Sequence, residues 1–192
     1  MNIKEYQLFA TPVWEMQNEI DETTLKRLID FSYNTVKLHP IKNAVSKRNG
    51  FNSEPIAIAN ADLMKILKLS IAGIKHAYQP IVEISVEKYW ININPPGAYN
   101  VRHNHPRSVL AATLYLQTPE NSGNLVIHNM NSAQQFAAYS SKPATYNFTE
   151  YRITPQPGTF VAFPGWVDHS VDINTSDTDR ISISMNIITK EV

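Results

Sequence analysis

The character of the chain changes at Pro80, and this change constrains the possible folds more than any other feature. Beyond it the sequence consists of short β-branched or aromatic runs separated by Pro, Gly, Asn and Ser, namely IVEISVEKYWINI, VLAATLYLQT, NLVIHN, YRIT, TFVAF and RISISMNII. Several short strands of this kind are typical of an antiparallel β-barrel or a double-sheet sandwich. We therefore expect a mainly β protein whose β core occupies residues 81–192.

Two helices are predicted before this β region. Residues 21–38 repeat apolar side chains at helical spacing, and Asp21 is suited to cap the first turn. Residues 61–78 show the same spacing, and Pro80 helps to end that helix. The polar stretch 39–55 predicts a connection. We expect both helices to support one sheet from outside, within a single domain that has helical support in residues 1–80.

The overall charge of the chain is balanced. Lys and Arg number 17, as do Asp and Glu, so nothing indicates a nucleic-acid or anionic-membrane partner. Four local basic residues are expected on a solvated loop and at the edge of a site: Lys47, Arg48, Arg102 and Arg107. The N-terminus lacks a signal-peptide pattern and no segment has the length of a membrane span, so we expect a cytoplasmic protein.

Histidine placement points to a metal site. The stretch NVRHNHPRS holds His103 and His105 two residues apart, and an extended backbone would aim both imidazoles the same way. Because the chain has no cysteine, a metal must rest on imidazole, carboxylate or amide oxygen. His169 is a candidate third ligand, whereas the adjacent Asp168 would point to the opposite side of an extended segment.

The last predicted strand, RISISMNII, has two different faces. One face is apolar and the other polar: Ile181, Ile183, Met185 and Ile187 alternate with Arg180, Ser182, Ser184 and Asn186. The polar face either meets water or lines a pocket. In a pocket, the Arg180 guanidinium would suit bidentate binding of a carboxylate.

These motifs together resemble the Fe(II)/2-oxoglutarate-dependent oxygenases. The likeness rests on a His-x-His pair, a distal His and an Arg-x-Ser beyond it. The segments WININPPGAYNVRHNHPRS, LYLQTPENSGNLVIHN and PQPGTFVAFPGWVDHSV, with DRISISMN, are similar to a group common in phages and marine bacteria that has an H-x-H-P-x-S motif. LFATPVW and KRNGFNSEP also resemble that group.

The resemblance implies a double-stranded β-helix, or jelly roll, and a set of site residues. His103, His105 and His169 would bind Fe(II), although most relatives have Asp or Glu where this chain has His105. Arg180 would bind the C5 carboxylate of 2-oxoglutarate, which is the co-substrate with O2, and Ser182 would assist it. Asn92 and Tyr115 are further candidates for contact with 2-oxoglutarate. No side chain is assigned as a catalytic acid or base.

Several other residues are candidates for the surroundings of the site. Five aromatic side chains could form walls of the pocket or belong to the core: Trp90, Tyr99, Tyr115, Phe163 and Trp166. His39 and His76 are expected at the surface, and His128 near the mouth of the barrel without binding metal. Arg102 and Arg107 flank the histidine pair and would either contact an anionic substrate or face solvent.

Three functions are compatible with the sequence. The first is a hydroxylase that uses Fe(II) and 2-oxoglutarate. The second is a cupin-like three-His metalloprotein that does not use 2-oxoglutarate, and the third is a non-catalytic jelly-roll module. Arg180 favours the first, because only co-substrate binding requires a buried cation near the distal His. The primary substrate stays open, and a homodimer is compatible with the sequence.

Overall fold

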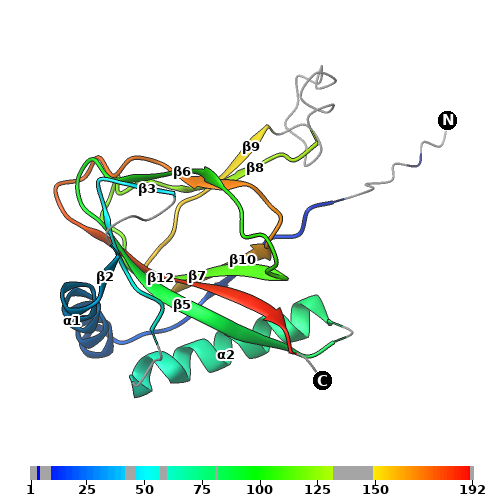
Figure 1. Ribbon diagram of the computed structural model, residues 1–192, viewed down its shortest axis with the longest axis horizontal. Coiled ribbons are helices and arrows are strands. Elements are labelled where there is room, and N and C mark those ends of the chain that lie inside the picture. The colour runs from blue at the N-terminus through cyan, green and yellow to red at the C-terminus, as the bar shows by residue number, and fades with distance from the viewer. Residues whose placement is uncertain are drawn as a thin grey trace.

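Two antiparallel sheets face each other in the computed structural model, which describes residues 4, 10–41, 46–56, 60–80, 82–131 and 149–190 (Figure 1). The larger sheet has seven strands in the order β1-β10-β7-β12-β5-β4-β2, and the smaller has five in the order β3-β6-β11-β8-β9. The strands are β1 (Trp14–Gln17), β2 (Pro40–Ile41), β3 (Lys47–Arg48), β4 (Phe51–Ser53), β5 (Ile84–Asn94), β6 (Tyr99–His103), β7 (Leu110–Gln117), β8 (Leu125–His128), β9 (Glu150–Ile153), β10 (Thr159–Pro164), β11 (His169–Val171) and β12 (Arg180–Thr189). This arrangement confirms the predicted fold class.

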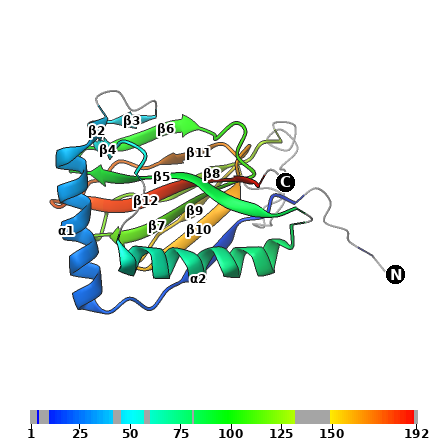
Figure 2. The same ribbon diagram turned by 60° about the horizontal axis from the view of Figure 1, so that its bottom comes forward.

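Both predicted helices are present, and both lie outside the seven-stranded sheet (Figure 2). Helix α1 (Glu22–Leu38) begins after Asp21, whose carboxylate accepts a hydrogen bond from the backbone N–H of Thr24 at 2.9 Å. Helix α2 (Ala61–Tyr78) begins after Asn60, which caps it in the same way. Within the described ranges, neither helix is long and apolar enough to cross a bilayer.

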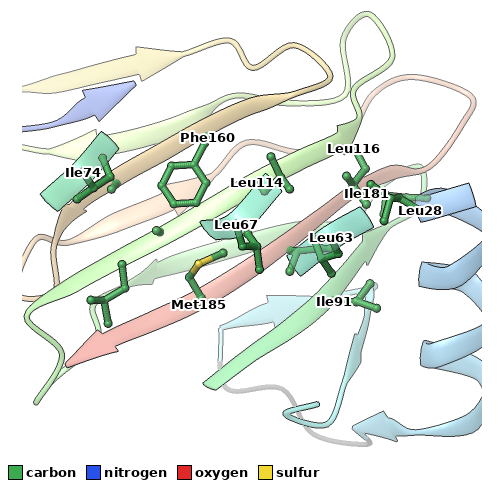
Figure 3. Packing of buried hydrophobic residues seen from close by; sticks show 14 of the residues in the cluster. Leu28, Leu63, Leu67, Ile74, Ile91, Leu114, Leu116, Phe160, Ile181 and Met185 are labelled. Atoms are coloured by element: carbon green, nitrogen blue, oxygen red, sulfur yellow. The ribbon is translucent and has the colours of Figure 1, made fainter. Parts of the chain in front are cut away.

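A dry apolar layer joins the helices to the sheet (Figure 3). Leucines and isoleucines of the two helices pack against side chains that point outward from β5, β7, β10 and β12. Its fully buried members include Leu28, Leu63, Ile74, Ile91, Leu114, Leu116, Phe160, Ile181, Ile183, Met185 and Ile187. Burial of this much apolar surface is the main source of stability in a domain of this size.

The space between the two sheets is different. A smaller apolar cluster, which includes Leu125, Ile127 and Val161, fills part of it. The rest holds buried polar side chains, among them Arg180 and Ser182 on the inner face of β12. Of the two alternatives for that polar face, the pocket is therefore correct.

The expectation of helices alone before Pro80 is incomplete. The stretch 39–55, predicted as a connection, contains β2, β3 and β4, and β1 lies before the first helix. Strands β1 and β4 pair with the larger sheet, whereas β3 pairs with β6 of the smaller one. Strands of two to four residues are too short to display a period, so the sequence pattern could not reveal them.

Candidate metal centre and its pocket

Three imidazoles converge between the sheets. His103 ends β6 and lies directly opposite His169, the first residue of β11, while His105 follows two residues after β6. The candidate ligand atoms of the three rings all lie within 4.8 Å of one another. The ring centroids of His103 and His169 are 4.2 Å apart, and those of His105 and His169 are 5.1 Å apart. The expected clustering is confirmed, and metal binding by the cluster remains a prediction.

A close backbone approach holds His105 in this position. Its backbone N–H donates to the carbonyl of Gly165 at 2.8 Å, in the turn that precedes β11. A side chain at Gly165 would place its Cβ 2.2 Å from the carbonyl oxygen of Ser108 and 2.9 Å from that of His105. Only glycine allows the two turns to approach this closely. The pairing of β6 with β11 brings His103 and His169 together, and the turn at Gly165 adds His105 to this cluster.

Backbone hydrogen bonds fix the tautomers of two rings. The Nδ1 of His103 lies 2.8 Å from the carbonyl of Val101, and the Nδ1 of His169 lies 3.1 Å from the carbonyl of Val167. Because a carbonyl oxygen only accepts, each Nδ1 must carry the proton, which leaves Nε2 with a free lone pair. The side chain of Asn186 on β12 lies near the His105 ring.

Burial keeps the three rings uncharged at neutral pH. It lowers the pKa of His103, and together with the neighbouring His103 it lowers the pKa of His105 to about 4. For His169, burial and the other two histidines lower the pKa to about 3. Neutral imidazole is the form that coordinates metals, so the cluster meets this requirement without a prior loss of protons.

The side chains expected to contact 2-oxoglutarate form a row across the larger sheet. Ser182 of β12 lies directly opposite Tyr115 of β7 on one side and Asn92 of β5 on the other. Arg180 lies two residues along β12 from Ser182 and is 2% exposed. Since directly paired residues share a face, all four side chains point into the space between the sheets.

Arg180 has donors that the described residues do not use. Its Nη1 donates to the carbonyl of Gly123 at 3.2 Å, while its buried Nε has no hydrogen-bond partner. The guanidinium carbon lies 5.9 Å from the ring centroid of Tyr115. A buried guanidinium with an unpartnered N–H is costly, so this geometry suits an anionic ligand in the adjacent cavity.

One cavity connects the histidines with Arg180. Its lining includes the three imidazoles, and it also includes four side chains of the larger sheet: Arg180, Ser182, Tyr115 and Asn92. Of the five aromatic candidates, Trp90, Tyr115 and Phe163 line it, whereas Tyr99 does not and Trp166 is 52% exposed. The Phe163 ring lies 4.7 Å from that of His169, and Trp90 stacks on His105 at 5.9 Å.

The remaining polar candidates lie outside the cluster. The Asp168 carboxylate accepts from Arg102 Nε and from Asn104 Nδ2, both at 2.8 Å, on the opposite side of the segment from His169. His128 Nε2 lies 2.9 Å from Ser170 Oγ, and His128 is not part of the cluster. His39, His76 and Arg107 are exposed, as expected for the two histidines.

Lys47 is the residue that the sequence interpretation placed wrongly. It was expected on a solvated loop, but it is 6% exposed, and its Nζ donates to Asn92 Oδ1 at 3.1 Å and to Asn94 Oδ1 at 2.9 Å. The error has a physical cause, because Lys47 becomes buried only when the two-residue strand β3 pairs with β6, and no local pattern reveals that pairing.

Comparison with known families identifies the class of protein. Residues 88–186, just over half of the chain, match the family described as "Putative 2OG-Fe(II) oxygenase". The chain therefore belongs to this family, and it is an Fe(II)- and 2-oxoglutarate-dependent oxygenase. No curated protein sequence matches it.

Solved structures share the fold. A prolyl-4-hydroxylase from Pseudomonas putida superposes with a TM-score of 0.67 at 15% identity, and the match covers 94% of each chain. The viral collagen prolyl hydroxylase of Paramecium bursaria Chlorella virus-1 gives 0.64 at 14% identity, covering 91% of this chain and 94% of the viral one. The epimerase SnoN from nogalamycin biosynthesis gives 0.70 at 10% identity, covering 94% of this chain and 79% of SnoN. At these identities the likeness supports the double-stranded β-helix fold.

Proposed function

We propose that His103, His105 and His169 hold the Fe(II) of this oxygenase, and that Arg180 holds the far carboxylate of 2-oxoglutarate. The observation that carries the proposal is the cavity itself: it joins three neutral, convergent imidazoles to a buried guanidinium whose Nε lacks a partner. The enzyme would act as a hydroxylase on a primary substrate that stays open.

The three imidazoles fit a divalent metal. Two of them present Nε2 lone pairs fixed by backbone carbonyls, and imidazole is a suitable donor for iron. A third imidazole in place of the usual carboxylate leaves the full charge of the metal uncompensated, which favours an anionic chelate such as a 2-oxo acid. When bound, Fe(II) activates O2 for the decarboxylation of 2-oxoglutarate, coupled to oxidation of a substrate C–H bond.

The row of side chains across the larger sheet fits the co-substrate. Arg180 would supply charge-assisted hydrogen bonds, and the Ser182 and Tyr115 hydroxyls would add neutral ones. Burial raises the pKa of Tyr115, which keeps its phenol protonated and able to donate. Asn92 lines the same cavity, although its amide oxygen already accepts from Lys47 and its Nδ2 donates to Ser184 Oγ at 2.8 Å. Asn92 would therefore shape the wall more than bind.

The aromatic lining would exclude water. Phe163 and Trp90 lie against His169 and His105 respectively, on the rings that would face the metal. A water-poor site strengthens the electrostatic hold on a charged co-substrate and protects a strong oxidant from side reactions.

The finer classification belongs to the same proposal. The H-x-H-P-x-S motif at residues 103–108 favours the phage and marine-bacterial group. We infer that residues 1–192 act as one domain, because β1 and β3 join different sheets of the later part. A cytoplasmic location and a homodimer complete the proposal, and light scattering would test the dimer.

An anaerobic titration tests the assignment of the site. Metal-free protein receives Fe(II) and then 2-oxoglutarate, and the metal-to-ligand charge-transfer absorbance of the chelate is recorded. We expect the band in the parent and its loss in His169→Ala. Arg180→Ala should weaken 2-oxoglutarate binding by roughly 2–5 kcal/mol while sparing Fe(II) affinity. Arg152→Ala, at a half-exposed arginine of β9, is the control.

Equal affinity of parent and Arg180→Ala for 2-oxoglutarate would show that the assignment of Arg180 is wrong. A three-His centre that does not use 2-oxoglutarate would then become the better description of these residues.

A further inference from the structure

A buried lysine spans the two sheets beside the proposed co-substrate site. Lys47 lies in β3 of the smaller sheet, opposite Asn100 of β6. Its Nζ reaches β5 of the larger sheet, where it donates to Asn92 and Asn94, and it also donates to the carbonyl of Phe51 at 3.3 Å. A buried ammonium group requires compensation for its lost hydration.

The contacts of Lys47 suit the charged form. Three oxygen acceptors surround Nζ, which matches the three hydrogens of an ammonium group. They provide dipoles and no negative charge. Burial and the nearby Arg180 lower the pKa of Lys47 well below its usual value. The site therefore holds the geometry for a cation but lacks the anion that would stabilise it.

Arg180 is in a similar situation: burial lowers its pKa, and the Asp172 carboxylate that raises it lies beyond ion-pair distance. Arg180 lies directly opposite Asn94 across β5 and β12, so one of the residues that accept from Lys47 is its neighbour in the sheet. Within the described ranges, neither Lys47 nor Arg180 lies within 4 Å of a carboxylate. Arg180 lines the cavity and Lys47 lies behind its wall, so an anion bound in the cavity would stabilise both of these mutually repelling cations.

A network of hydrogen bonds connects Lys47 to the wall of the cavity. Asn92 accepts from Lys47 and donates to Ser184, while Asn94 accepts from Lys47 and donates to Asn100 Oδ1 at 3.3 Å. Asn92, Asn100 and Ser184 all line the cavity. Lys47 itself does not line it, so it would act on a ligand through its field and through these amides.

We propose that Lys47 is a positioning residue that selects a dicarboxylate co-substrate, because its charge adds to that of Arg180 at the far carboxylate of 2-oxoglutarate. This rests on the proposed function, in which Arg180 binds that carboxylate. A unit charge several ångströms from a buried carboxylate changes affinity by roughly 10- to 100-fold at an effective dielectric constant of about 20. A 2-oxo acid without the second carboxylate has no charge at this position, so it gains much less from this field.

The test compares two ligands that differ in that carboxylate. Binding of 2-oxoglutarate and of 2-oxopentanoate to the Fe(II)-loaded protein is measured anaerobically through the charge-transfer band. Lys47→Met removes the charge and keeps an unbranched side chain that is one atom shorter. We expect it to lose about 10- to 100-fold in affinity for 2-oxoglutarate and less than about threefold for 2-oxopentanoate. Arg48→Met, at the exposed neighbouring position, should leave both affinities unchanged.

A second variant tests the same idea without removing the lysine. Asn94→Asp keeps the shape of the side chain and retains an acceptor for Lys47, but it adds a negative charge between Lys47 and Arg180. Asn94→Asp should also weaken the binding of 2-oxoglutarate more than the binding of 2-oxopentanoate. If Lys47→Met fails to fold, an unchanged affinity of Asn94→Asp for 2-oxoglutarate would still overturn the inference.

The outcomes separate the two proposals. An equal loss for both ligands in Lys47→Met would indicate a structural role and overturn the inference, as would unchanged 2-oxoglutarate affinity in Asn94→Asp. If Arg180→Ala keeps the parent's preference for 2-oxoglutarate, the proposed function itself is wrong and the role of Lys47 falls with it. A selective loss in Arg180→Ala, Lys47→Met and Asn94→Asp supports both.

Discussion

The two faces of the seven-stranded sheet are buried to a similar degree but carry different chemistry. On β12, Ile181, Ile183 and Met185 point outward and are fully buried beneath the helices. Arg180 and Ser182 point inward and are 2% and 5% exposed. A single strand thus separates a dry apolar layer from a polar cavity.

Stability and ligand binding depend on different faces of this sheet. Each buried apolar side chain on the outer face contributes favourably when water is removed. Each buried polar group on the inner face costs free energy unless it is hydrogen-bonded, and the unpartnered Nε of Arg180 has no such compensation. We therefore expect outer-face changes to act on folding and inner-face changes to act on binding.

The largest expected effect is on the outer face. Phe160 is fully buried between β10 and the helices, so Phe160→Ala should lower the free energy of unfolding by about 3–5 kcal/mol. Urea denaturation would measure this change. Phe51→Ala, at a phenylalanine that is 55% exposed, is the matched control and should change stability by less than about 0.5 kcal/mol.

Binding should respond differently to the same variant. Below its unfolding transition, Phe160→Ala should keep the parent's affinity for 2-oxoglutarate. A stable Phe160→Ala protein that has lost this affinity would contradict the separation of the two faces.

The second expected effect is a pH dependence that comes from the histidine cluster, which the smaller sheet places across the cavity from the inner face. Burial lowers the pKa of His105 to about 4 and that of His169 to about 3, from 6.5 in the unfolded chain. The unfolded state therefore binds more protons between about pH 6.5 and 4, and stability of the metal-free protein should fall as the pH falls through this window. The slope should approach about 1.4 kcal/mol per pH unit for each such histidine.

Replacement of one histidine tests the origin of the slope. Urea denaturation across this pH range should give a shallower dependence for His169→Asn than for the parent. His76→Asn, at an exposed position of α2, should leave the dependence unchanged. An unaltered slope in His169→Asn would mean that other groups cause the loss of stability in acid.

The sequence predicted the long elements and the directions of their side chains well. Helices of 17 and 18 residues and the ten-residue strand β12 are long enough for a period to be visible. Alternation therefore placed Arg180 on the face opposite Ile181, but it left open whether that face meets water or lines a pocket. The convergence of His103 with His169 followed from the family resemblance, since no local pattern pairs β6 with β11.

The missed features depend on contacts between distant parts of the chain. Lys47 is buried because β3 pairs with β6, and the tautomers of His103 and His169 depend on backbone carbonyls whose direction the sequence does not reveal. The close approach at Gly165 likewise requires the turn that carries His105. Positions of this kind are fixed by tertiary packing and not by local propensity.

The smallest expected effect compares two neighbouring residues of β12. Ser182 faces the cavity and Ile183 faces the helices. Ser182→Ala should weaken 2-oxoglutarate binding by about 0.5–1.5 kcal/mol, the usual net contribution of one neutral hydrogen bond, because its hydroxyl would no longer assist Arg180. Stability should change little, since alanine fills nearly the same volume.

Ile183→Ala should instead destabilise the fold without affecting binding, with a loss of about 2–5 kcal/mol in the free energy of unfolding and an unchanged affinity for 2-oxoglutarate. Anaerobic titration and urea denaturation of both variants would measure the four quantities. A loss of stability in Ser182→Ala equal to that in Ile183→Ala would show that the inner face supports the fold as strongly as the outer one, and the contrast between the two faces would then be wrong.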